Sequence, residues 1–118
     1  MLNRAALIVR PRQPFTYWTA GLDASVALPN PNDEQTVYLI PEYEHREHAN
    51  ELLEIGHLQI FERELACRCI DESKWPSRRD FATFKEWFAV EFHSIIEDLC
   101  DDVLIDDELI DEELLEKE

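Results

Sequence analysis

The sequence predicts a single α+β or small α/β domain, in which a sheet of about three strands is covered by helices in the order β-α-β-α-α-β. Two short runs, residues 4–10 and 36–42, are rich in strand-forming residues and are closed by prolines. Other stretches repeat apolar residues at helical spacing. The 118 residues suffice for one hydrophobic core and are too few for two.

The first strand and the first helix follow each other closely. The run "RAALIVR" is almost continuously apolar, which predicts a buried strand and favours it as the central one. Pro14 suits the first position of a helix, and Phe15, Trp18 and Leu22 continue at helical spacing. Residues 28–35 have the composition of a loop.

The middle of the chain predicts a strand over residues 36–42 and a long helix over residues 44–66. Gly56 lies inside this helix and costs about 1 kcal/mol relative to alanine, which would allow a kink or close packing there. The apolar stripe of the helix consists of Ala49, Leu52, Leu53, Ile60, Phe61 and Leu65.

The stretch "SKWPSRRDFATFKEWFAVEFHS" predicts a core wall. Ser77 can cap a helix, and the aromatic residues that follow occupy one helical face. These residues are Phe81, Phe84, Trp87 and Phe88. A third strand is expected over residues 91–98. Because the connections are helical, we expect parallel or mixed strand pairing.

Negative charge dominates the chain. The net charge is −16, and residues 101–118 contribute −9 with ten acids and one lysine. We therefore divide the chain into a domain, residues 1–100, and an acidic tail, residues 101–118, which is either an amphipathic helix or disordered. An acidic surface repels phosphates and anionic membranes, so direct nucleic-acid or membrane binding is disfavoured, whereas a basic protein partner is compatible.

The cysteines and the N-terminal residues indicate a cytoplasmic protein. Three cysteines form an odd set, no signal-peptide pattern is present, and no window is apolar enough to span a membrane. Reduced thiols are therefore expected.

A candidate ligand site follows from the predicted parallel or mixed strands. Their carboxyl ends would gather Arg10, Arg12, Glu42, Tyr43 and, from the third strand, His93. Two arginines could hold a carboxylate or a phosphate. Alternatively, they pair with the protein's own acids. No catalytic residue is assigned.

Two further groups have weak signals. No zinc pattern is matched by the group of His45, His48, Cys67 and Cys69. Neither a metal nor another cofactor is therefore expected. A basic island around Trp75, formed by Lys74, Arg78 and Arg79, could dock an acidic peptide or the protein's own tail.

The segments "NRAALIVRPRQPF", "TVYLIPE", "WP" and "EFHS" give the chain a resemblance to a family of small acidic bacterial proteins of unassigned function. The resemblance covers about residues 3–99. It implies a bacterial cytosolic origin and carries no activity, cofactor or catalytic residue with it.

The function we expect is non-catalytic protein binding or regulation, with a basic partner. The expected partner-binding residues are Asp101, Asp102, Asp106, Asp107, Glu108, Asp111 and Glu112, together with the exposed face of the long helix. One alternative is a small-anion binder or minor enzyme that uses the arginine-lined edge. Others are a nucleic-acid mimic and a homodimer joined by an exposed apolar patch.

Overall fold

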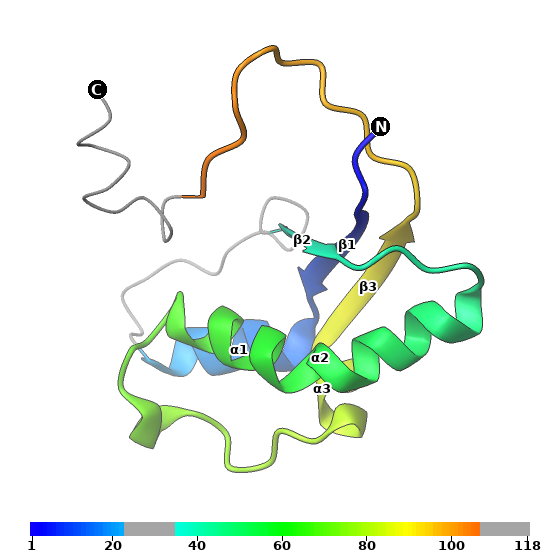
Figure 1. Ribbon diagram of the computed structural model, residues 1–118. Coiled ribbons are helices and arrows are strands. Elements are labelled where there is room, and N and C mark those ends of the chain that lie inside the picture. The colour runs from blue at the N-terminus through cyan, green and yellow to red at the C-terminus, as the bar shows by residue number, and fades with distance from the viewer. Residues whose placement is uncertain (23–34, 107–118) are drawn as a thin grey trace.

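The computed structural model describes residues 1–22 and 35–106, and the α+β class and the order of elements are confirmed there (Figure 1). The elements are β1 (Ala5–Pro11), α1 (Gln13–Leu22), β2 (Thr36–Ile40), α2 (Arg46–Ala66), a 3₁₀ turn η1 (Glu72–Lys74), α3 (Phe81–Trp87) and β3 (Phe88–His93). Of the predicted loop over residues 28–35, only Gln35 lies within the described residues.

The three strands pair in the order β2-β1-β3, and both pairings are antiparallel. The prediction of a central first strand is confirmed, whereas the prediction of parallel or mixed pairing is wrong. The main-chain amide of Arg12 donates to the carbonyl oxygen of Trp87 at 2.7 Å, which places the start of β3 at the end of β1. Since β3 begins there, it runs back along β1. A helical connection permits a crossover but does not require one.

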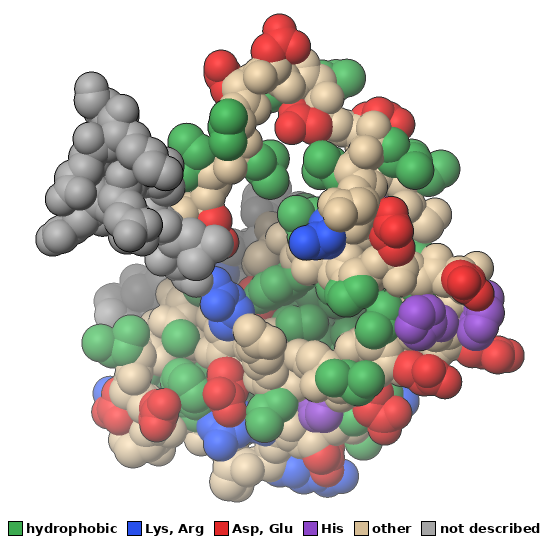
Figure 2. Space-filling view, viewed as in Figure 1, with side chains coloured by type: hydrophobic (Ala, Val, Ile, Leu, Met, Phe, Trp, Pro, Cys, Tyr) green, Lys and Arg blue, Asp and Glu red, His purple; other side chains and the backbone are tan. Residues whose placement is uncertain are grey.

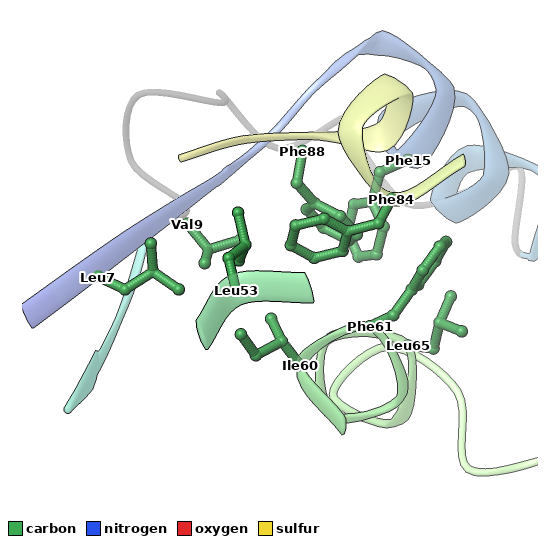
Figure 3. Packing of buried hydrophobic residues seen from close by; sticks show 9 residues of the cluster. All are labelled: Leu7, Val9, Phe15, Leu53, Ile60, Phe61, Leu65, Phe84 and Phe88. Carbon is green, nitrogen blue, oxygen red and sulfur yellow. The ribbon is translucent and has the colours of Figure 1, made fainter. Parts of the chain in front are cut away.

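The helices lie on one side of the sheet, and the core fills the space between them (Figure 1). Leu7 and Val9 of β1 are completely buried because alternate strand residues face the helices. Figure 3 shows how the side chains of the core meet. The core comprises Leu7, Val9, Phe15, Leu53, Ile60, Phe61, Leu65, Phe84 and Phe88.

The aromatic stretch forms part of this core, as predicted. Phe84 is completely buried, and its ring centroid lies 6.0 Å from that of Phe61 and 5.2 Å from that of Phe88. Two details of the prediction are wrong. The helix is capped by Asp80 instead of Ser77, because the Asp80 carboxylate accepts from the Thr83 amide at 2.8 Å.

The second wrong detail is where the last strand begins. The prediction assigned Phe88 to the helix and started the strand at residue 91, but Phe88 has extended dihedrals (φ −136°, ψ 140°). It pairs with Pro11, so β3 starts directly after α3. The strand also ends earlier than the predicted residue 98. Residues 94–106 contain neither helix nor strand, although the Leu2 amide donates to the Ile96 carbonyl oxygen at 2.8 Å.

The cap of α3 should make the stability of the fold depend on pH. Hydrogen bonds from Thr83, and then from Arg78 at 2.9 Å, lower the pKa of Asp80 below its ordinary value of 3.8. A lowered folded-state pKa stabilises the fold above the ordinary value, and this stabilisation is lost as the pH falls through the folded-state pKa. An asparagine at this position would still cap the helix but cannot titrate. We expect the wild type to exceed Asp80→Asn in urea midpoint at pH 7, and the difference to shrink below about pH 4. A pH-independent difference would contradict this.

None of the described helices is long and apolar enough to cross a membrane.

Candidate functional site: a groove between the edge strand and the long helix

A groove of about 710 Å³ separates β2 from α2. Its wall is mostly apolar, and Figure 2 shows hydrophobic side chains gathered in a hollow at the centre of this face. The apolar lining comes chiefly from Leu7, Tyr38, Ile40, Leu52, Leu53 and Ile60. A concave apolar surface of this size is the kind that binds ligands or peptides.

The groove runs along the outer edge of β2. Since β1 occupies the other edge, no strand within residues 1–22 and 35–106 pairs with this one. Val37 and Leu39 border the groove, but their side chains, 59% and 49% exposed, alternate with those of Thr36 and Tyr38 and so point away from α2. Ile55 lines it from α2 and is 82% exposed. A strand edge of this kind, with apolar side chains beside it, can bind an added strand.

Two adjacent rows of residues on α2 explain why the helix helps to form both the core and the groove. One row reaches the core through Leu53, Ile60 and Phe61. The next row, which includes Leu52 and Gly56, lines the groove. A Cβ at Gly56 would meet nothing within 4 Å, so this glycine borders open space and serves no close packing. The helix continues unbroken through it, because α2 spans all of Arg46–Ala66.

A buried carboxylate lies at one end of the groove. Glu64 is 8% exposed, and its Oε2 accepts from the Tyr38 hydroxyl at 2.6 Å and from the Thr36 hydroxyl at 3.0 Å. Burial, and then the hydrogen bond to Glu64, raise the pKa of Tyr38 well above its ordinary value of 10.0. Tyr38 is therefore a permanent hydrogen-bond donor at neutral pH and a poor general base.

A second hollow of about 220 Å³ adjoins the first. Thr36, Glu64 and Cys67 line both, so the carboxylate stands between two spaces. Pro11, Phe15 and other residues close the second hollow. This arrangement suits recognition of a polar group by a fixed carboxylate.

Comparisons with known family models, with curated proteins and with solved structures gave no match.

The structure brings together two of the residues that we assigned to an anion site. The Arg10 guanidinium lies 3.5 Å from Glu91 Oε2, and His93 Nε2 lies 2.6 Å from the same oxygen. These contacts form on the sheet face opposite the core, because Arg10 and Glu91 alternate with core residues. Hydrogen bonds from His93, and then from Arg10, lower the pKa of Glu91 below 4.5. Arg10 is thus paired with an acid of the protein itself.

The other three residues of that site do not all lie at one end of the sheet. Arg12 follows the end of β1, whereas Glu42 and Tyr43 follow the end of β2. Antiparallel pairing sets these two ends at opposite ends of the sheet, so the predicted gathering of Arg12 with Glu42 and Tyr43 is wrong, whereas the carboxyl ends of β2 and β3 both lie beside the start of β1. The Tyr43 ring packs against Phe92, with centroids 5.9 Å apart. None of the five residues lines the groove or the second hollow.

Only some of the expected partner-binding acids lie within the described residues. Asp101, Asp102 and Asp106 are exposed, and Asp106 lines the groove. The remaining four, Asp107, Glu108, Asp111 and Glu112, lie outside the described residues.

The weaker motifs have structural roles. His45 Nδ1 accepts from the His48 amide at 3.2 Å and so caps α2. Within the described part of the chain, no group of three or more His, Cys, Asp or Glu side chains could hold a metal ion. In the basic island, Arg78 pairs with Asp80 and the Arg79 guanidinium lies 5.6 Å from the centre of the Trp75 ring.

Sequence reasoning missed Thr36, Tyr38 and Glu64. A signal was present, because Glu64 follows Ile60 by four positions and so continues the buried stripe of α2. A charged residue at a buried position needs a partner, and the alternating Thr36 and Tyr38 were candidates.

Proposed function

We propose that this protein is a non-catalytic protein-binding module that takes a basic, partly apolar segment of another protein into the groove between β2 and α2. The observation that carries the proposal is the groove itself, an apolar hollow of about 710 Å³ beside a strand edge that the described strands leave unpaired.

An extended segment fits this groove better than a helix does. The edge of β2 offers backbone donors and acceptors along five residues, Thr36–Ile40. A strand added there would gain main-chain hydrogen bonds, and every second side chain would point toward the apolar wall. Affinity would come from the backbone and selectivity from the groove.

The charge of the protein favours a basic partner. The net charge is −16, and α2 alone carries five glutamates against two arginines. Charges of this kind accelerate association and discriminate between partners more than they add affinity. We further propose that binding takes place in the cytoplasm, which suits Cys67, Cys69 and Cys100, all of them free thiols.

A labelled hexapeptide of alternating lysine and leucine tests the proposal by fluorescence anisotropy. We expect it to bind at about 0.05 M salt and to weaken at about 0.5 M salt. Replacing its leucines by serine should abolish binding, because the apolar contacts are lost. Replacing its lysines by glutamate should do the same through charge repulsion. Equal binding of the serine peptide would show a purely electrostatic association and contradict the proposal.

Gly56 offers a matched pair of variants that locates the binding. Gly56→Phe places a ring in the open space of the groove, and we expect it to weaken the lysine–leucine peptide at least about tenfold. Gly56→Ala leaves the groove open and should bind normally. It should also raise the free energy of unfolding by about 0.5–1 kcal/mol, because alanine favours a helix over glycine. If both variants bind like the wild type, the peptide binds elsewhere.

A further inference from the structure

Glu64 is an unusual residue for the wall of an apolar groove. Only 8% of it is exposed, and it lies on the side of α2 that elsewhere presents Ile60, Phe61 and Leu65 to the core. A buried carboxylate costs stability unless it is paired, and apolar residues of similar volume often serve stability as well or better. Its presence at the groove therefore points to a role in recognising a ligand.

The hydrogen bonds of Glu64 leave one oxygen with capacity for a ligand. Both hydroxyls, from Thr36 and Tyr38, donate to Oε2. An ionised carboxylate accepts about four hydrogen bonds in total, so Oε1 keeps room for a donor. The hydroxyls also fix the carboxylate in place, which reduces the entropy that a ligand must remove on binding.

This geometry discriminates between kinds of cation. A guanidinium is bound best by two carboxylate oxygens at once, and Oε2 already accepts two hydroxyls. A primary ammonium is a compact charge that needs one strong acceptor. The apolar wall formed by Leu52, Leu53 and Ile60 would accommodate the alkyl chain behind it.

We propose that Glu64 is the specificity-determining residue of the groove and that it receives a primary ammonium carried on an apolar chain, such as a lysine side chain of the bound segment. This inference rests on the proposed function. Arg63 and Asp106, which have opposite charges, also line the groove, so the preference must come from direct contact with Oε1 and not from the general field.

Three small probes test the inference on the wild-type protein. Hexylamine, hexylguanidine and hexanol are titrated at neutral pH and followed by amide chemical shifts. We expect all three to perturb residues of β2 and α2, with hexylamine binding about tenfold or more tightly than hexanol and more tightly than hexylguanidine. Equal affinities for hexylamine and hexanol would overturn the role of Glu64 while leaving the groove as a binding site. If no probe perturbs the groove, the proposed function fails as well.

Two charge-neutralising variants on the same helix complete the test. Glu64→Gln keeps the size of the side chain and an acceptor for the hydroxyls, and its amide spectrum verifies folding. It should lose most of the preference for hexylamine and retain hexanol binding. Glu62→Gln removes the same charge at a residue that does not line the groove, and it should behave like the wild type. Equal losses in the two variants would show a general charge effect and overturn the inference.

Discussion

Replacing Phe84 by alanine is expected to lower the free energy of unfolding by about 3–5 kcal/mol, the largest effect that we predict for a single substitution in this chain. The ring is completely buried between Phe61 and Phe88, and its removal leaves a cavity that α3 and the sheet cannot close without moving. Because the free energy of unfolding of a small domain is only about 5–15 kcal/mol, the variant should remain folded with little stability to spare. Urea unfolding followed by tryptophan fluorescence measures the loss.

Phe81 provides the matched control for this experiment. It lies one turn earlier on α3 and is only half-buried, with its ring centroid 6.4 Å from that of Phe84. Phe81→Ala should therefore cost less than half as much as Phe84→Ala. Equal losses would indicate that the aromatic contacts of α3, and not burial in the core, dominate its stability.

Replacing Tyr38 by phenylalanine is expected to cost about 1.5–3 kcal/mol at neutral pH, because a hydrogen bond to the buried Glu64 carboxylate is lost. The effect should depend on pH. A folded-state pKa raised above 10.0 gives a stabilisation that is fully present below the ordinary value and is lost as the pH rises toward the folded-state value. The difference between wild type and variant should therefore shrink above about pH 10.

The control for this prediction is Tyr17→Phe. The Tyr17 side chain is 61% exposed, and its hydroxyl accepts from Gln13 at 2.6 Å on the surface of α1. Losing this contact should change stability little, since water replaces it. A Tyr38→Phe variant as stable as Tyr17→Phe would show that Glu64 does not depend on the tyrosine hydroxyl.

Local patterns revealed most of the elements, whereas their pairing depended on contacts that no local pattern encodes. The apolar run around Val9 and the helical spacing of Phe81 and Phe84 are visible in short windows. The direction of β3 is evident only from its pairing with β1, which is distant in sequence. Phe88 fits helical spacing as well as a strand, so only its pairing with Pro11 decides its conformation.

The candidate site was harder to predict than the fold for the same reason. Thr36 and Tyr38 are separated from Glu64 by 28 and 26 residues, and nothing in either segment alone indicates that they meet. The expected gathering of Arg10 and Glu42 at one edge of the sheet was wrong because it assumed parallel strands. Exposed side chains such as Glu42 follow no hydrophobic periodicity. A wrong strand direction therefore changes their predicted neighbours while the predicted hydrophobic pattern stays consistent.

The central position of β1 has a consequence during protein synthesis. This strand is made first, but its partner β3 occupies residues 88–93, about 80 positions later. At about 5–20 residues per second, the ribosome needs about 4–16 s to supply that partner. The apolar strand must remain unpaired on that edge for this interval, and pairing over such a distance is itself slow. Residues 5–9 of the nascent chain therefore lack this partner until translation has passed β3.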